Sequence, residues 1–304
     1  MALLTASGMH ETVTPPRFAV PRGACDCHMH VFGPPDLYPP AASRSYTPRP
    51  APFPAYRSVA STLGLERVVF VQPSAYGADN RCMLDAMATV GPSARGIAAV
   101  DGTASDDALR DMAASGVRGL RLNAVSRGLR DIRDIEPMLR DAVRRAGPLG
   151  WHVQIFADLD LIAALGPVLR GIGIPVVIDH MALARPAPGT AQPGFADLCE
   201  LLAGGHCWVK LAGADRISGG DDGGFRDALP IMRALIAVNP DALVWGTDWP
   251  HTGRHGHAPH SAPPTIEYRP VDAGRLLNLL AEAAGDDPTL RRILVDNPAR
   301  LYGF

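Results

Sequence analysis

The sequence predicts an α/β fold in which eight strand–helix units form a single domain. Three observations indicate this: short apolar runs alternate with helix-like segments, there are eight such runs, and 304 residues suffice for one large domain. Strands that alternate with helices build parallel βαβ units. Eight of these units close into a (β/α)8 TIM barrel, and barrels of this length are commonly single domains.

The predicted strands are the apolar runs at 24–32, 67–74, 94–101, 117–125, 151–158, 175–181, 207–215 and 243–251. The segments between them include NRCMLDAMATV, SDDALRDMAASG, IEPMLRDAVRRAG, FADLCELLAGG and FRDALPIMRALIAV, which are helix-like in composition. In the second of these, Ser105 is a suitable N-cap and Gly116 a suitable C-cap.

Three segments do not fit the strand–helix repeat. Residues 1–22 are polar and rich in proline, so we predict an N-terminal arm over 1–22 and a barrel domain over 23–304. The proline-rich stretch 33–54 predicts a long loop after the first strand, of the kind that often serves as a lid. The stretch 251–270 follows the last strand, and of its histidines only His251 is close enough to Asp248 to be a site candidate.

Charge and cysteine content limit the class of protein. The formal net charge of −2 indicates no nucleic-acid-binding surface. Five dispersed cysteines, an odd number, argue against a disulfide framework. Neither a signal peptide nor a membrane span is evident. We therefore expect a cytoplasmic protein, monomeric or a small homo-oligomer, without nucleic-acid or membrane partners.

Polar residues repeatedly end the predicted strands. Active sites of these barrels lie at the carboxyl ends of the strands. Residues i and i+2 of a strand share a face, so His28 and His30 should project together, and His180 and Asp248 end two later strands. A single barrel histidine is more often structural than catalytic. Three histidines that converge with a carboxylate instead predict a hydrolytic centre made of His28, His30, His180 and Asp248.

Other polar residues near the strand ends have either a functional or a structural role. Arginine binds carboxylates in bidentate geometry, and the position of Arg121, Arg127 and Arg216 just after strands favours substrate binding over surface ion pairs. Lys210 is expected to be a buried ion-pair partner rather than a nucleophile. Cys25 and Cys27 alternate with His28, so we expect them to pack outside the barrel.

The motifs are similar to those of a known family. HxH on the first strand, His on the sixth and Asp on the eighth resemble the amidohydrolase superfamily. The series VQPSAYGADN, ARGIAAVD, GVRGLRLN, GWHVQIF, VVIDHM, WVKLAGADR, WGTDWPH and NPARLYGF resembles the 2-pyrone-4,6-dicarboxylate lactonase family over residues 22–304. The resemblance implies a barrel that hydrolyses a lactone of a small polycarboxylate. It implies reaction-centre roles for the four residues above and substrate contacts at Tyr46, Ser74, Arg121, Arg127 and Arg216, to which His251 is added by position.

Two departures from the family bear on the substrate. The family's strand-5 tyrosine is Phe156 here, and its arginine after the strand-6 histidine is displaced to Arg185. These changes leave the reaction class intact and leave the lactone open: a sulfonated muconolactone or a sugar-acid lactone fits as well.

A binuclear metal site is not expected, because it needs a lysine or glutamate on strand 4 and a histidine at the end of strand 5. Arg121 and Phe156 occupy those ends, and His152 is about 13 Å further down its strand. His28, His30, His180 and Asp248 could hold one zinc ion. We nevertheless expect no required metal, because Arg121 places a permanent cation nearby and the family that this chain resembles works without one.

The expected reaction is hydrolysis of an activated cyclic ester. Asp248 would act as general base on water, and the histidines, one or more of them protonated, would stabilise the oxyanion. Arg121, Arg127 and Arg216 would hold at least two anionic groups. The alternatives are a zinc-dependent decarboxylase of an aromatic or enolic acid, a lactone isomerase, and a carboxylate-binding barrel without catalysis.

Overall fold

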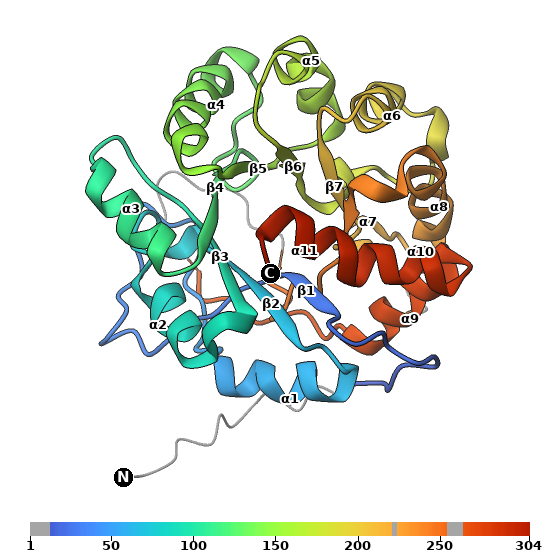
Figure 1. Ribbon diagram of the computed structural model, residues 1–304, viewed down its shortest axis with the longest axis horizontal. Helices are drawn as coiled ribbons and strands as arrows, with labels where there is room; N and C mark the ends of the chain where they lie inside the picture. Colours follow the sequence, from blue (N-terminus) through green and yellow to red (C-terminus); the bar gives the residue numbers. More distant parts are fainter. Residues whose placement is uncertain (1–12, 221–223, 254–263) are drawn as a thin grey trace.

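The computed structural model describes residues 13–220, 224–253 and 264–304, and its centre is a parallel barrel (Figure 1). The strands lie in chain order: β1 (Cys25–Met29), β2 (Arg67–Val71), β3 (Ala94–Ala98), β4 (Val117–Asn123), β5 (His152–Phe156), β6 (Val176–Ile178), β7 (Trp208–Lys210) and β8 (Leu243–Val244). The chain after β8 closes the barrel onto β1, because the amide of Cys27 donates to the carbonyl of Trp245 over 2.9 Å. A Cβ atom on Gly246 would lie 2.5 Å from the amide nitrogen of His28, so this close approach requires glycine.

Helices surround the barrel (Figure 1). They are α1 (Phe53–Leu63), α2 (Arg81–Val90), α3 (Asp106–Ala114), α4 (Ile132–Ala146), α5 (Leu159–Arg170), α6 (Phe195–Ala203), α7 (Ala214–Ile217), α8 (Leu229–Val238), α9 (Ala273–Ala284), α10 (Asp287–Arg291) and α11 (Asn297–Tyr302). Ser105 caps α3 as predicted, accepting from the amide of Ala108. The fold prediction is confirmed. None of the described helices is long and apolar enough to cross a membrane.

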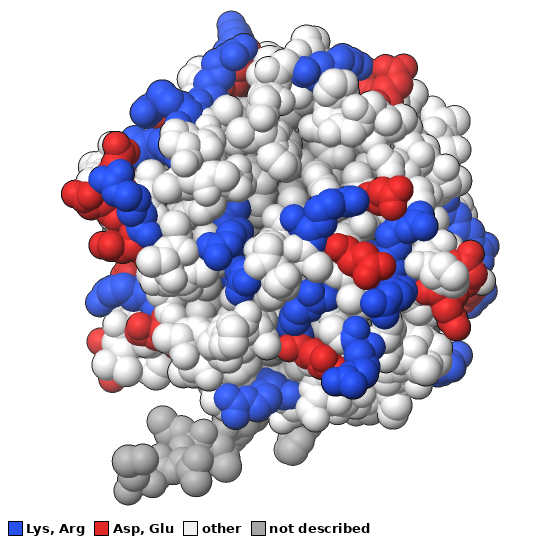
Figure 2. Space-filling view, in the orientation of Figure 1, with Lys and Arg blue, Asp and Glu red and all other residues white. Residues whose placement is uncertain are grey.

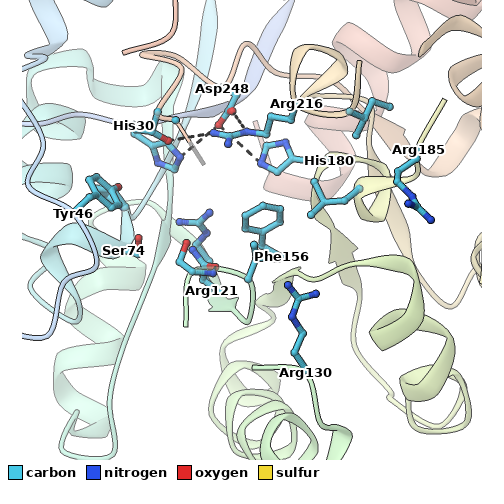
Figure 3. A pocket seen from close by; sticks show the side chains of 18 residues that line it. His30, Tyr46, Ser74, Arg121, Arg130, Phe156, His180, Arg185, Arg216 and Asp248 are labelled. Carbon is cyan, nitrogen blue, oxygen red and sulfur yellow. Dashed lines mark hydrogen bonds and ion pairs between the residues drawn. The ribbon is translucent and has the colours of Figure 1, made fainter. Parts of the chain in front are cut away.

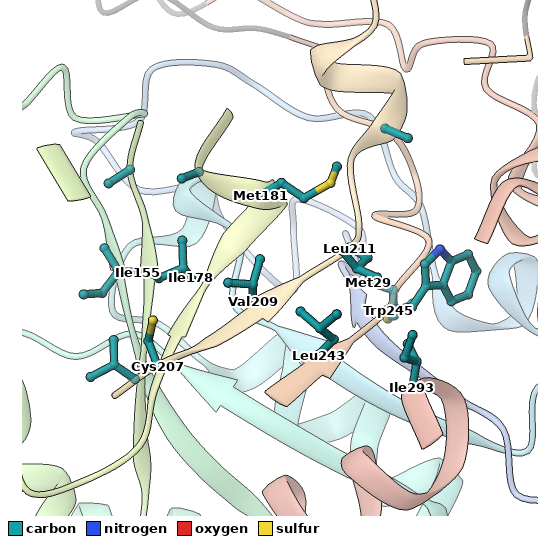
Figure 4. Packing of buried hydrophobic residues seen from close by; sticks show 14 of the residues in the cluster. Met29, Ile155, Ile178, Met181, Cys207, Val209, Leu211, Leu243, Trp245 and Ile293 are labelled. Carbon is teal, nitrogen blue, oxygen red and sulfur yellow. The ribbon is translucent and has the colours of Figure 1, made fainter. Parts of the chain in front are cut away.

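Two apolar layers alternate along the strands. The outer layer joins strand residues such as Ile155, Ile178 and Val209 to the helices (Figure 4). A smaller cluster gathers Cys25, Cys27, Val69, Val71, Ile97 and Val244 with Tyr302 of α11. Because its members come from neighbouring strands and alternate with outer-layer residues, this cluster fills the barrel interior.

The expected outward position of Cys25 and Cys27 is therefore wrong. Asp26 is the residue that points outward, where its carboxylate accepts from the Tyr56 hydroxyl of α1 over 2.8 Å. The register of β1 against β2 shifts between Asp26 and Met29, so strict alternation fails there. This irregularity lets both Cys27 and His28 face inward.

The segments outside the repeat pack against the barrel where they are described. The amide of Thr14 donates to Asp272 over 2.9 Å and that of Arg17 to Asn278 over 2.7 Å, which fixes residues 13–22 against α9. Residues 1–12 of the predicted arm, and His255, His257 and His260, lie outside the described residues, and the boundary at 23 stays a prediction. Basic and acidic side chains are interspersed on the face drawn in Figure 2, which carries no continuous basic surface among the residues described.

Candidate active site

A cavity of about 430 Å³ lies at the carboxyl ends of the strands (Figure 3). Its polar lining includes His30, Tyr46, Ser74, Arg121, Asn123, Arg130, His180, Arg185, Arg216 and Asp248. Its apolar lining includes Val125, Phe156, Leu183 and Ile217. The predicted strand ends thus meet in one place, as the barrel topology requires.

Three imidazoles converge on one carboxylate oxygen at the floor of this cavity. The Nε2 atoms of His28, His30 and His180 lie 3.7, 3.6 and 3.9 Å from Oδ1 of Asp248. All four side chains are buried. His28 and His30 lie together and meet His180 and Asp248, which follow the sixth and eighth strands. The sequence motifs predict this arrangement.

Local backbone geometry directs two of these side chains. His180 and Asp248 have left-handed φ values of 52° and 61°. Such values are uncommon for residues other than glycine and recur at functional sites. Gly213 allows the loop after β7 to pass His180, because a Cβ atom there would lie 2.8 Å from its Nδ1. That loop leads into α7, which carries Arg216.

Asp248 is held ionised. Burial alone would raise its pKa, but Arg216 and the surrounding histidines outweigh burial and hold the pKa well below the usual range. Nε of Arg216 donates to Oδ2 of Asp248, and NH2 of Arg216 donates to the Thr252 hydroxyl over 3.2 Å. Oδ1 has no hydrogen-bond partner among the described residues, so it remains available for chemistry.

Burial favours the neutral form of all three imidazoles, and the expectation that one or more is protonated stays a prediction. Burial is the main cause of a lowered pKa at His28, His30 and His180, and for His30 it brings the pKa to about 3. Nδ1 of His30 lies 2.7 Å from the carbonyl oxygen of Val71. A carbonyl only accepts, so Nδ1 carries the proton of the neutral ring, and the Nε2 lone pair faces Asp248.

A second charged layer lies beneath this centre. Lys210 and Asp179 are fully buried and 3.5 Å apart, so Lys210 is an ion-pair partner as predicted. Gln154 accepts from Lys210 over 2.7 Å and donates to Asp179 over 2.9 Å. Sequence reasoning missed Gln154, although it is a polar residue two positions before Phe156 and hence on the same inward face.

The structure brings most predicted substrate contacts to the cavity. Tyr46 and Ser74 line it, and a hydrogen bond between them partly offsets the burial that raises the pKa of Tyr46. Arg121 lines it while its NH1 donates to the Gln72 carbonyl over 2.7 Å. Arg216 lines it beside Asp248.

Two predicted contacts lie elsewhere. Arg127 is exposed and absent from the cavity lining, whereas Arg130 of the same loop lines the cavity. His251 is fully buried and also outside the lining. Burial lowers the pKa of His251 to about 4, and the negative charge of Asp215 partly opposes this shift. Arg130 and Arg185 are cavity residues that were not proposed as substrate contacts.

The centre fits a single divalent ion. One ligand atom each from His28, His180 and Asp248 lie within 4.8 Å of one another. Within the described ranges, His28 Nε2 and Asp248 Oδ1 lack a hydrogen-bond partner. His30 is not a member of this group, but its Nε2 lies 3.6 Å from the same carboxylate oxygen. With His30, the donor set would be three nitrogens and one oxygen, which suits zinc.

A (β/α)8 barrel with a histidine–aspartate centre at its carboxyl end defines a class of hydrolytic enzymes. The family model described as amidohydrolase matches residues 25–304, and the chain belongs to this family.

Relatives and solved structures agree with this assignment. The chain is 36% identical to a 4-sulfomuconolactone hydrolase from Hydrogenophaga intermedia, over 97% of this chain and 94% of that protein. It is 34% identical to a 2-pyrone-4,6-dicarboxylate hydrolase from Comamonas testosteroni, over 94% and 92%. It is 30% identical to a D-galactarolactone isomerase from Agrobacterium fabrum, over 95% and 94%. A probable 2-pyrone-4,6-dicarboxylic acid hydrolase from Acinetobacter baumannii, with citric acid bound, superposes with a TM-score of 0.75 at 26% identity, over 93% and 100%.

Proposed function

We propose that this enzyme hydrolyses the ester bond of a small polyanionic lactone, either 2-pyrone-4,6-dicarboxylate or a related carboxylated or sulfonated muconolactone. The observation that carries the proposal is that Asp248 shares one cavity with the cationic side chains of Arg121 and Arg216. One carboxylate oxygen of Asp248 has no hydrogen-bond partner among the described residues. The names of the relatives support the same reaction class.

Charge complementarity supports a substrate with more than one anionic group. Arg121 and Arg216 lie at the floor, and Arg130 and Arg185 lie further out (Figure 3). Guanidinium groups bind carboxylates and sulfonates through paired N–H donors, which fixes both position and orientation. The citric acid bound by the Acinetobacter baumannii protein, a tricarboxylate, is consistent with such a site.

Asp248 is the general base of the proposed reaction. Its carboxylate is ionised, and Oδ1 would accept a proton from the attacking water. Because burial favours neutral imidazoles, the oxyanion of the tetrahedral intermediate would be stabilised by guanidinium N–H groups of Arg121 and Arg216. The Nε2 lone pair of His28 or His30 would hold the water by accepting a hydrogen bond from its second O–H group.

His28, His30, His180 and Asp248 would hold the metal ion if one is used, and such an ion would lower the pKa of water and polarise the lactone carbonyl. The expectation of a reaction without a required metal stays a prediction. The roles of Arg121 and Arg216 in substrate binding are the same in both cases.

A lactone isomerase is the second candidate, supported by the similarity to D-galactarolactone isomerase. An isomerase transfers the acyl group to another hydroxyl of the same molecule, so it releases no acid. Hydrolysis of a lactone at neutral pH releases one proton for each ring that opens.

The test is proton release in a pH-stat, with lactones that carry two anionic groups, one or none. The proposal predicts one proton per turnover and a steep fall in kcat/KM as anionic groups are removed. Turnover without proton release would establish the isomerase instead. Equal rates for charged and uncharged lactones would contradict the binding role of the arginines.

A further inference from the structure

Asp179, Lys210 and Gln154 form a buried layer in contact with the far side of the His28 ring. Nδ1 of His28 lies 3.4 Å from Oδ1 of Asp179 and 3.3 Å from Nζ of Lys210. All of these side chains are fully buried. The layer touches the reaction centre through His28, whose Nε2 lies 3.7 Å from Asp248.

The ammonium group of Lys210 has fewer N–H groups than there are acceptor atoms around it. Its Nζ lies 2.9 Å from the Cys27 carbonyl and 2.7 Å from Oε1 of Gln154, and these distances account for two of its three N–H groups. The third can point to Oδ1 of Asp179, 3.5 Å away, or to Nδ1 of His28. The choice decides which nitrogen of His28 carries the proton.

The needs of Asp179 settle this choice. Its Oδ2 accepts from Nε2 of Gln154, whereas Oδ1 has no other hydrogen-bond donor among the residues described. If Lys210 donated to His28, a buried carboxylate oxygen would be left without a donor, which is costly. If Nδ1 of His28 is protonated, both the ring and the lysine donate to Oδ1 of Asp179, and each polar group of this layer has a partner. Nε2 of His28 and Oδ1 of Asp248 are then left without a partner among the described residues.

We infer that Asp179 is a positioning residue that keeps the proton of His28 on Nδ1 and so directs the Nε2 lone pair at the carboxylate of Asp248. Lys210 holds Asp179 in place, and Gln154 fixes the orientation of both. The carbonyl of Val71 does the same for His30 through its contact with Nδ1. His28 and His30 therefore present the same acceptor nitrogen to one point, although their partners differ.

The consequence for the reaction rests on the proposed function. Two acceptor nitrogens beside an ionised carboxylate can bind a metal ion or accept hydrogen bonds from a water molecule. An Nε2–H group would instead compete with water for Asp248. Asp179 would therefore affect kcat rather than substrate binding, since it lies below the centre and does not line the cavity.

The direct test is ¹⁵N NMR of histidine-labelled, chelator-treated protein, in which protonated and unprotonated ring nitrogens give well-separated shifts. The signal lost on His28→Gln identifies His28. We predict a protonated Nδ1 and an unprotonated Nε2 in the unsubstituted protein. The reverse assignment would overturn the inference without any variant of Asp179, and the result does not depend on which lactone is the substrate.

Two substitutions should act in opposite ways. Asp179→Asn keeps its oxygen toward Gln154 and turns an NH2 group toward His28, so the proton should move to Nε2 and kcat should fall about 10- to 100-fold with little change in KM. Lys210→Met removes the competing donor, so the proton should stay on Nδ1. Asp272→Asn, which alters the carboxylate that caps α9, should leave the His28 signals in place. An unchanged spectrum in folded Asp179→Asn, or a reversed one in Lys210→Met, would contradict the role of Asp179.

Discussion

Arg216 and Asp248 form a buried ion pair, and the two oxygens of the Asp248 carboxylate have different surroundings. Oδ2 accepts from Nε of Arg216, while Oδ1 faces the imidazoles of His28, His30 and His180. The pair holds Asp248 in its ionised form. It also places a guanidinium group beside the atom proposed to take the proton of water, where the substrate oxyanion would form.

Substitution of Asp248 tests the proposed base. Asp248→Asn preserves the shape of the side chain and removes its charge, so kcat should fall by roughly 10²- to 10⁴-fold, the usual contribution of general base catalysis. Steady-state kinetics with circular dichroism as the check on folding measures this. Glu282→Gln, which alters an exposed ion pair with Arg226, should retain full activity. A folded Asp248→Asn enzyme with the unsubstituted rate would exclude Asp248 as the base.

Arginine substitutions distinguish the cavity from its surroundings. Arg121→Met should raise KM about 10- to 100-fold, because a charge-assisted hydrogen bond contributes about 1.5–3 kcal/mol. Its effect on kcat should be smaller if the contact binds substrate and transition state alike. Arg127→Met is the matched control, because Arg127 is exposed and outside the cavity lining. A larger KM effect at Arg127 than at Arg121 would reverse the assignment made from the structure.

Buried histidines should make the protein sensitive to acid. Burial lowers the pKa of His30 and of His152 to about 3, against an ordinary value of 6.5. Between these values the unfolded chain binds more protons than the folded one, so stability is complete above pH 6.5 and falls as the pH drops toward 3. Each such histidine contributes a slope of up to about 1.4 kcal/mol per pH unit.

His152→Gln tests this dependence away from the cavity. His152 packs against Tyr302 inside the barrel, with a distance of 5.4 Å between the two ring centroids. Below pH 6.5, the free energy of unfolding of the variant should fall by about 1.4 kcal/mol less per pH unit than that of the unsubstituted protein. Urea unfolding at several pH values measures this difference. Parallel curves for the variant and the unsubstituted protein would mean that His152 is not buried in its neutral form.

Phe156 should control which lactones are accepted. Its ring lies 5.0 Å from that of His180, centroid to centroid, and lines the cavity. Phe156→Tyr adds a hydroxyl at this wall, so KM for 2-pyrone-4,6-dicarboxylate should fall severalfold, as expected for one hydrogen bond of about 1 kcal/mol. KM values for dicarboxylated and sulfonated lactones, measured on both proteins, would show the change. An equal effect on both substrates would mean that Phe156 does not discriminate between them.

The sequence was sufficient to predict the barrel, because apolar runs and helix-like segments alternate with a regular spacing. It also identified His28, His30, His180 and Asp248, because period-two spacing and strand ends decide where these side chains meet. It failed at Cys25 and Cys27, because the register shift in β1 has no signature in residue type. Arg127 and Arg130 are three residues apart in one loop, and only the path of the backbone decides which of them reaches the cavity.

The most direct test of the central proposal is the loss of ultraviolet absorbance of 2-pyrone-4,6-dicarboxylate with chelator-treated enzyme, before and after zinc is added, with 4-sulfomuconolactone followed in parallel. We predict ring opening of at least one of these lactones, and its disappearance in Asp248→Asn. Turnover before zinc is added would show that the side chains alone suffice, and turnover only afterwards would assign His28, His30, His180 and Asp248 as metal ligands. No turnover of either lactone under both conditions would contradict the proposal that this enzyme is a hydrolase of polyanionic lactones.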